Sequence, residues 1–319
     1  MLEGRGKRVY VQEVSTRDGF QIEAAFVPTA AKIALINDLS RTGLTKIEAT
    51  SFTSPKAIPN LRDAEEVMRG IERVPGVIYA ALVPNVRGAE RALAARVDEI
   101  NLVMSVSETH NLANLRMTRE QSFAQLADVM RTARGAEAAI NASLSTCFGC
   151  PMEGHVPEDE VWRWTARLVE AGADGVSLCD TTGMAHPDQV ARLVEDFRRR
   201  WPNTTLTLHL HNTRGLGLAN ALAALSVGAD RFDASLGGLG GCPYAPGATG
   251  NVCTEDLAHM LEAMGYATGI DLDRLLACAR SLPAIIGHDV PGQVAKAGRI
   301  TDLHPEPVWL PEVRALGRT

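Results

Sequence analysis

The sequence of 319 residues is poor in cysteine and in aromatic residues, and it has no excess of positive charge. Six cysteines are too few for a disulfide scaffold in a chain of this length, so we expect a reducing, cytoplasmic environment. No apolar run approaches the roughly 18 residues that a membrane-spanning helix needs. With 32 basic and 38 acidic residues, the net charge of −6 argues against nucleic acid as a partner.

We expect no targeting signal, and the sequence has one closely spaced pair of cysteines. Residues 1–8 contain no apolar signal core and are too few for a transit peptide, which again favours the cytoplasm. Cys147 and Cys150 have the spacing of a redox or zinc motif. Because the sequence holds no second such pair and no thioredoxin-like context, we interpret them as plain thiols at the end of a strand.

What the sequence does contain is an alternation of strand-like and helix-like segments that occurs eight times. Apolar residues at helical spacing follow the short β-rich runs, and glycines stand at several expected helix ends. The expected strands are Val9–Val14, Lys46–Ser51, Val77–Val83, Glu99–Ser105, Ile140–Thr146, Gly175–Cys179, Thr205–His211 and Arg231–Leu236. The expected helices are Thr29–Thr42, stretches near 61–73, 87–96, 118–135, 158–171, 187–200 and 215–227, and one after Asn251.

This alternation predicts the fold class. Strands that are separated by helices pair in parallel, and eight such units over about 250 residues are what a closed (β/α)8 TIM barrel requires. A doubly wound open sheet is the alternative, but residues 15–19 lack the Gly-rich phosphate turn that it would carry. We therefore predict a TIM-barrel catalytic domain over residues 1–270. A short helical and irregular appendage, packed on the barrel, is expected over residues 271–319.

Polar side chains gather where the expected strands end, which is where TIM barrels hold their active sites. His209 and His211 are two residues apart on a strand, so their side chains leave on one face and can reach one point. Asp18 adds a carboxylate and Asn251 an amide oxygen. Two imidazoles with two oxygen ligands suit Mg²⁺ or Mn²⁺, whereas structural zinc would prefer thiolates. A structural pair of hydrogen-bonded histidines would show the same spacing.

Other charged or reactive residues are expected near the same mouth. Glu48 either orients Arg17, supports the metal ligands from behind or forms an ordinary structural ion pair. Cys242 belongs to the Gly-rich segment 237–251, which is either a flexible surface loop or a lid. A thiol on a lid could act as a nucleophile or as a proton donor. The sixth expected strand leads directly into Asp180.

Six segments carry motifs that can be compared with known families. They are 13–23 with Arg-Asp-Gly, 47–56 with Glu-Ala-Thr-Ser, 107–111 with Ser-Glu-Thr-His-Asn, 149–154 with Gly-Cys-Pro, 209–215 with His-x-His, and 237–256 with Gly-Gly-Cys-Pro-Tyr-Ala. Through them the chain, from residue 9 to residue 300, resembles the 3-hydroxy-3-methylglutaryl-CoA (HMG-CoA) lyase family. The Arg-Asp-Gly and His-x-His motifs occur across the wider superfamily of metal-dependent barrels, which includes isopropylmalate synthases, whereas the Gly-Gly-Cys-Pro-Tyr-Ala loop is specific to the lyases.

The resemblance implies a metal-dependent barrel, a homodimer, that cleaves HMG-CoA to acetoacetate and acetyl-CoA in leucine degradation. Its cofactor would be Mg²⁺ or Mn²⁺ and its partner an acyl-CoA substrate. The implied metal ligands are Asp18, His209, His211 and Asn251. The implied catalytic residues are Arg17, which would stabilise the thioester oxygen as it becomes an enolate, Cys242, which would take part in proton transfer, Glu48 and Asp18. The supporting residues are Glu255 and Asp180. The base that removes the hydroxyl proton is Cys242, Asp18 or a histidine.

Several positions depart from the family pattern, namely Phe20, Ile22, Met152, Asn212 and Arg214. Asn212 removes a negative charge beside the expected metal, and Arg214 adds a positive charge near the mouth. A related branched 3-hydroxyacyl-CoA is therefore an alternative substrate, and we expect Arg214 to contact its acid group or the CoA phosphate. A Claisen-condensing acyltransferase or an aldolase of the same superfamily is the alternative reaction. A non-catalytic metal or CoA binder would be a further alternative.

Overall fold

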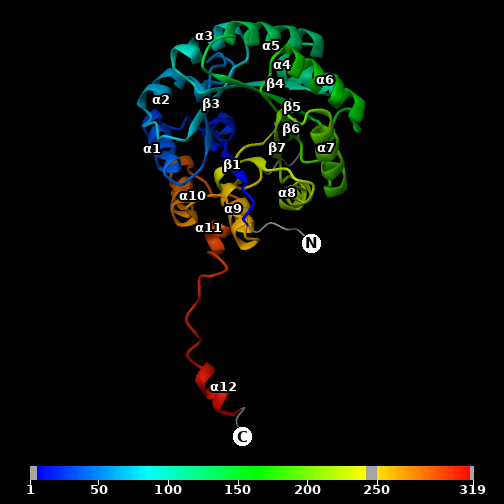
Figure 1. Cartoon of the computed structure of the whole chain (residues 1–319). Coiled ribbons are helices and arrows are strands. Elements are labelled where there is room, and N and C mark those ends of the chain that lie inside the picture. Colours follow the sequence, from blue (N-terminus) through cyan, green and yellow to red (C-terminus); the bar gives the residue numbers. More distant parts are fainter. Residues whose placement is uncertain (1–5, 242–249, 317–319) are drawn as a thin grey trace.

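A closed barrel of eight parallel strands forms the centre of the computed structural model, which describes residues 6–241 and 250–316 (Figure 1). The strands are β1 Tyr10–Glu13, β2 Lys46–Ser51, β3 Ile78–Leu82, β4 Glu99–Ser105, β5 Ala139–Ser145, β6 Gly175–Asp180, β7 Thr205–Leu210 and β8 Arg231–Ala234. The barrel closes because β1 pairs in parallel with both β2 and β8. This arrangement confirms the predicted TIM barrel and excludes the open sheet.

Helices surround the barrel, except the last one in the described part of the chain, which lies away from it (Figure 1). They are α1 Thr29–Ser40, α2 Ala64–Gly70, α3 Val86–Ala94, α4 Glu108–Leu115, α5 Arg119–Ala133, α6 Glu158–Ala171, α7 Pro187–Arg200, α8 Gly217–Ser226, α9 Thr254–Ala263, α10 Leu272–Ile286, α11 Val294–Ala297 and α12 Leu310–Leu316. Short helical turns occur at η1 Ser15–Gly19, η2 Phe20–Ile22, η3 Pro59–Leu61 and η4 Leu236–Gly238. The sequence pattern does not predict α4, which is an extra helix between β4 and α5.

The start of α4 is set by a local cap. The Ser107 hydroxyl accepts the backbone N–H of His110 at 3.1 Å, which satisfies one of the free donors at the start of a helix. The helix ends at Leu115, and the next residue, Arg116, has a left-handed backbone with a φ of 56°. The segment 107–111, which the sequence analysis used only as a family motif, thus also contains the start of this helix.

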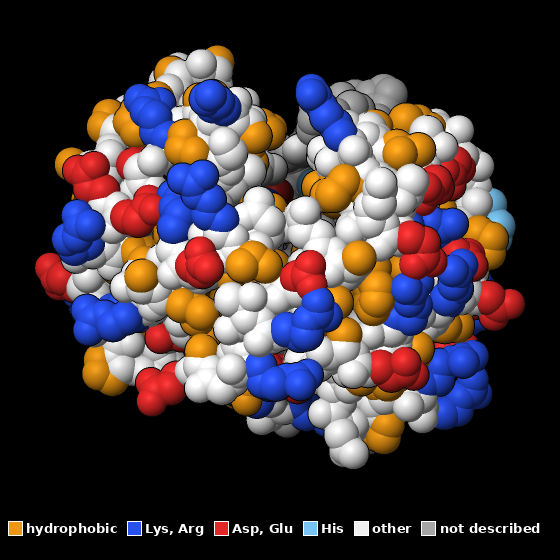
Figure 2. Space-filling view, turned by 90° about the horizontal axis from the view of Figure 1, so that it is seen from above, with side chains coloured by type: hydrophobic (Ala, Val, Ile, Leu, Met, Phe, Trp, Pro, Cys, Tyr) orange, Lys and Arg blue, Asp and Glu red, His pale blue; other side chains and the backbone are white. Residues whose placement is uncertain are grey.

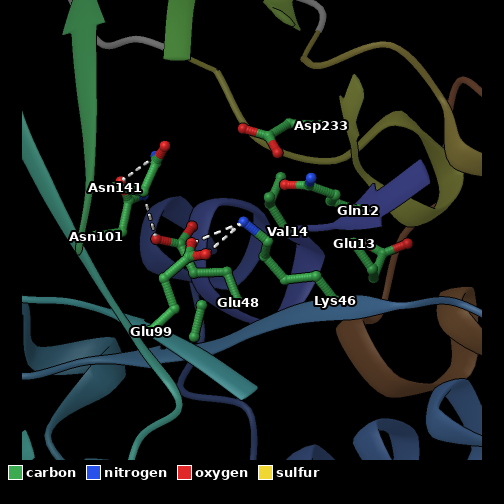
Figure 3. A pocket seen from close by; sticks show the side chains of 10 residues that line it. Gln12, Glu13, Val14, Lys46, Glu48, Glu99, Asn101, Asn141 and Asp233 are labelled. Atoms are coloured by element: carbon green, nitrogen blue, oxygen red, sulfur yellow. Dashed lines mark hydrogen bonds and ion pairs between the residues drawn. The ribbon is translucent and has the colours of Figure 1, made fainter. Parts of the chain in front are cut away.

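Alternate residues of each strand point into the barrel, and many of them are polar, so the interior is polar. Lys46 Nζ lies 2.7 Å from Glu99 Oε1, and the amide of Asn141 donates to Asn101 Oδ1 at 3.0 Å (Figure 3). These side chains line a cavity of about 10 Å³ below the mouth, which has room for about one water molecule. The apolar residues of the strands face outward and pack under the helices, so the fold holds its polar groups along the barrel axis.

The C-terminal segment consists of two different parts. Helix α10 packs against α1 and α9, and α11 packs against α9 and α10. Residues 299–302 still contact the barrel helices, because the backbone N–H of Ile300 donates to His259 Nε2 at 3.2 Å and Arg299 Nη1 donates to Asp273 Oδ2 at 3.2 Å. After residue 302 the chain leaves the barrel, and α12 lies far from it at the end of an extended stretch (Figure 1). The predicted boundary at residue 270 stays a prediction. Within the described ranges, no helix combines the length and apolarity needed to cross a membrane.

Candidate metal centre

Asp18, His209 and His211 lie together at the mouth of the barrel. Asp18 belongs to the turn η1 directly after β1, His209 to β7, and His211 follows β7. Their ligand atoms all lie within 4.8 Å of one another, and the Nε2 atoms of the two histidines are 3.2 Å apart. All three residues are buried. The structure thus brings three of the four predicted metal ligands to one point.

Asn251, the fourth predicted ligand, joins this group. An antiparallel bridge pairs it with His211, and its Nδ2 donates to Asp18 Oδ2 at 2.8 Å and to the Leu239 carbonyl at 2.9 Å. Its Oδ1 is buried and has no hydrogen-bond partner in the described part of the chain. A buried acceptor without a partner is costly in a folded protein. This oxygen and the adjacent imidazoles therefore fit a bound cation.

The protonation states of His211 and Asp18 also suit a cation. Burial, and after it the charge of His209, lower the pKa of His211 to about 3, so this imidazole is neutral. Burial opposes ionisation of Asp18, but the Arg17 guanidinium and the imidazoles outweigh it and lower the pKa of this carboxyl below its usual value. A neutral imidazole and an ionised carboxylate are the forms that bind a metal.

Arg17 is held beside this group by two carboxylates. Its Nε donates to Glu48 Oε2 at 2.5 Å and its Nη1 to Asp18 Oδ1 at 2.6 Å. The amide of Asn101 donates to the other Glu48 oxygen at 2.7 Å, so Glu48 is fixed from two sides. Burial disfavours the guanidinium charge, yet Glu48 and Asp18 raise the pKa of Arg17 above its usual value. This geometry fits both an orienting role of Glu48 toward Arg17 and an ordinary structural ion pair, so the role of Glu48 stays a prediction.

The two predicted supporting residues bind loop backbone. Asp180 Oδ1 accepts the N–H groups of Met184 at 2.7 Å and Ala185 at 3.0 Å, and burial raises the pKa of Asp180 to about 7. Glu255 Oε2 accepts the N–H of Gly237 at 3.0 Å, and burial raises the pKa of Glu255 to about 7. Both residues thus shape the loops of the mouth from beneath.

Cys242 lies outside the described residues, as does the rest of 242–249. The described beginning of this Gly-rich segment passes close to two of the predicted metal ligands, Asp18 and Asn251. A Cβ atom at Gly240, whose φ is +97°, would lie 2.5 Å from Asn251 Nδ2 and 2.9 Å from Asp18 Oδ2. Only glycine allows the backbone to come this close in this conformation.

Arg214, which departs from the family pattern, contacts a neighbouring loop. Its Nη1 donates to the carbonyl groups of Thr182 at 3.0 Å and Gly183 at 2.8 Å, on the loop that follows β6. This contact fixes Arg214 near Asp180. The predicted contact between Arg214 and the substrate stays a prediction.

A second group of potential ligands, Cys253, Glu255 and Asp256, has ligand atoms within 4.8 Å of one another. Asp256 is already engaged, because its Oδ1 accepts the backbone N–H groups of Gln293 at 3.0 Å and Val294 at 2.7 Å. Burial raises the pKa of the Cys253 thiol well above its usual value, so the thiol is protonated. This group ties the start of α11 to α9.

Sequence reasoning missed Asp233 and Asn101, both of which face the barrel interior (Figure 3). Asp233 Oδ2 lies 3.2 Å from His209 Nδ1, and Asn101 donates to Glu48. A signal existed for Asp233, because it alternates with the apolar residues Phe232 and Ala234 in an expected strand. A single carboxylate on the inward face of a barrel strand needs a polar partner. Since β7 is the neighbouring strand, His209 on its inward face is a candidate for that partner.

Comparisons with known proteins agree with this geometry. Residues 8–282 match the HMGL-like family model. The chain is 47% identical over 287 residues to hydroxymethylglutaryl-CoA lyase YngG of Bacillus subtilis, which covers 90% of this chain and 96% of that protein. It is 40% identical over 291 residues to the mitochondrial hydroxymethylglutaryl-CoA lyase of Mus musculus, and the match covers 91% of this chain and 90% of that protein.

Solved structures show the same relationship. An HMG-CoA lyase from Acinetobacter baumannii, in complex with coenzyme A and 3-methylmalate, superposes with a TM-score of 0.90 at 56% identity and covers 94% of this chain and 98% of that one. The Bacillus subtilis HMG-CoA lyase superposes with a TM-score of 0.89 at 46% identity, and the match covers 92% of this chain and 99% of that one. The predicted resemblance is confirmed, and this chain belongs to the HMGL-like family of HMG-CoA lyases.

Proposed function

We propose that this protein is a divalent-metal-dependent carbon–carbon lyase that cleaves HMG-CoA to acetoacetate and acetyl-CoA. The observation that carries the proposal is the convergence of Asp18, His209, His211 and Asn251 beside the buried guanidinium of Arg17. The names of the relatives at 40–47% identity support the same reaction. This cleavage needs both a metal site and a positively charged side chain in a fixed position beside it, and Arg17 is such a side chain.

Cleavage breaks the bond between C2 and C3 of the 3-hydroxyacyl-CoA. The C3 hydroxyl loses a proton, C3 becomes the ketone of acetoacetate, and C2 leaves as the enolate of acetyl-CoA. Mg²⁺ or Mn²⁺ bound by the four ligands would supply a Lewis acid that lowers the pKa of the hydroxyl group and polarises the developing ketone. Asp18, His209, His211 and Asn251 would hold that ion.

Arg17 would meet the negative charge that grows on the thioester oxygen. Preorganised charge of this kind is most effective where water is excluded, and Arg17 is only 7% exposed. Glu48 and Asp18 keep the guanidinium in one orientation before substrate arrives. No rearrangement of Arg17 is then required during the reaction.

Two proton transfers complete the reaction. One removes the C3 hydroxyl proton and the other protonates C2 of the enolate. We assign the thiol of Cys242 to this exchange on the family resemblance, with Asp18 and a histidine as the alternative bases. Asp180 and Glu255 would support the loops around the substrate.

The substrate class follows from the relatives and from local charge. The relative from Acinetobacter baumannii is described in complex with coenzyme A. An acidic acyl-CoA needs local cations because the chain carries a net charge of −6. The surface in Figure 2 shows Lys and Arg side chains on both sides of a hollow at its upper edge.

We further infer a homodimer, which light scattering would test, and a cytoplasmic location.

The deciding experiment is an activity assay on the purified full chain. With HMG-CoA and Mg²⁺ or Mn²⁺ we expect acetoacetate and acetyl-CoA in equal amounts, loss of both with a chelator, and recovery when metal is restored. A panel of branched 3-hydroxyacyl-CoAs tests the alternative substrates. Consumption of acetyl-CoA that depends on a 2-oxoacid, without acetoacetate formation, would instead identify a condensing enzyme.

A further inference from the structure

We propose that Asp233 is a positioning residue of the metal centre. It would hold His209 so that the Nε2 atom of the ring, and not Nδ1, faces the ion. This inference rests on the proposed metal site, and it assigns a role to a residue of β8 that does not itself reach the ligand group.

The geometry places Asp233 directly behind His209. The two residues are register partners in the pairing of β7 with β8, so their side chains leave the sheet on the same face. Asp233 Oδ2 lies 3.2 Å from Nδ1 of His209, and both side chains are 11% exposed. On the opposite side of the ring, Nε2 faces the Nε2 atom of His211 at 3.2 Å.

A carboxylate at this position determines the tautomer of the ring. An ionised carboxylate only accepts hydrogen bonds, so Nδ1 of His209 must carry the proton. The lone pair is then on Nε2, which is the atom that points into the group of ligands. Metal-bound histidines generally donate their second N–H to such a partner, which fixes the ring and strengthens it as a ligand.

The two histidines are not equivalent in this respect. Nδ1 of His211 is buried and lacks a hydrogen-bond partner among the described residues. His211 is instead held through its backbone, by the bridge to Asn251. Asp233 therefore acts on one ligand only, and its loss should weaken the metal site through His209 alone.

Asp233 has other charged neighbours, so the alternative is that it only balances charge inside the barrel. Its carboxylate acts electrostatically on Arg17 and Glu48 as well as on His209. If Asp233 served only to balance these interior charges, its replacement would change the stability of the barrel and leave the affinity for metal unchanged. Metal affinity therefore separates the two roles, and it can be measured without substrate.

The test is the dissociation constant of Mn²⁺ for the full chain, measured from the free Mn²⁺ signal in electron paramagnetic resonance. We expect Asp233→Asn to bind Mn²⁺ about 10- to 100-fold more weakly than the parent protein. Asp230→Asn, which removes the same charge just before β8 where the side chain is 48% exposed, should leave the affinity unchanged. Far-UV circular dichroism of each variant reports its folding.

A double-mutant cycle tests whether the effect of Asp233 on Mn²⁺ affinity depends on His209. In a His209→Asn background, Asp233→Asn should have no further effect on Mn²⁺ affinity. Unchanged affinity in the single variant, or an equal loss with and without His209, would overturn the inference. If the parent protein bound no Mn²⁺, the proposed function itself would be wrong. If the parent protein bound Mn²⁺ and Asp233→Asn bound it equally well, only the role of Asp233 would be wrong.

A second measurement needs no variant. In the Mg²⁺-loaded parent protein with ¹⁵N-labelled histidine, nuclear magnetic resonance should show the proton of His209 on Nδ1. A proton on Nε2 would mean that the ring is turned the other way, and the inference would be wrong.

Discussion

Replacing Arg17 with Gln tests whether this guanidinium acts on the reaction or only separates two carboxylates. Arg17 lies 2.5 Å from Glu48 and 2.6 Å from Asp18, and all three are buried. Its removal leaves two buried carboxylates without their cation, which should lower the free energy of unfolding by about 3–5 kcal/mol. The enolate oxygen also loses its charged partner, so kcat should fall by about 10²- to 10³-fold.

The double variant Arg17→Gln/Glu48→Gln distinguishes these two effects. Neutralising Glu48 removes one of the unpaired charges, and Asn101 can still donate to the amide oxygen that replaces the carboxylate. We expect urea unfolding to show that much of the stability returns, while HMG-CoA cleavage stays slow. If kcat recovered together with stability, Arg17 would have only a structural role and the reasoning would be refuted.

A matched control removes an exposed ion pair of the same kind. Arg41 pairs with Glu72 at the surface, where the two side chains are 41% and 66% exposed. Because exposed pairs contribute little, Arg41→Gln should change the free energy of unfolding by no more than about 1 kcal/mol and leave kcat unchanged.

Three further predictions concern pH, backbone and metal. Burial raises the pKa of Glu255 from 4.5 to about 7. The protonated form is therefore favoured by folding, and the free energy of unfolding should fall by up to about 3 kcal/mol as pH rises through this range. Urea unfolding at several pH values should show a flatter profile for Glu255→Gln, and an identical slope would contradict the assignment. Gly240→Ala would place Cβ 2.5 Å from Asn251 Nδ2, so Mn²⁺ titration should show weaker binding, and unaltered affinity would count against the site. Mn²⁺ at 100 times its dissociation constant should raise the free energy of unfolding by about 2.7 kcal/mol, and no shift in the unfolding midpoint would contradict it.

The barrel could be predicted from the sequence because its two periodicities are strong. Each strand alternates with a helix whose apolar face repeats at helical spacing, and the closed sheet has that order. The predicted bounds of α6 and α7 agree with the structure at both ends. Helix α4 escaped prediction because it has only eight residues and directly precedes α5.

The site could be predicted where ligands share a local pattern, and less well where they do not. His209 and His211 share one strand face, so their proximity follows from spacing alone. Asp18 and Asn251 could be expected near the same mouth from their places after the expected strands, and the family resemblance implied the same four ligands. Their distances from the histidines depend on how β1 and the loop before α9 meet, which spacing alone does not give. The contact of Asp233 with His209 depends on the register of β7 and β8, which no local spacing reveals.

The C-terminal segment shows a limit of another kind. Composition predicts an irregular appendage there, and Pro305, Pro307 and Pro311 agree with that expectation. Composition does not tell which parts of it pack on the barrel. In the structure α10 and α11 do, whereas the stretch after residue 302 extends away from it (Figure 1).

Anomalous scattering from crystals of the protein soaked with Mn²⁺ tests directly whether these four residues bind one cation. We expect a single strong peak at the mouth of the barrel, within coordination distance of Asp18, His209, His211 and Asn251. A peak elsewhere, for instance at Cys253 and Glu255, with none between the two histidines, would contradict it.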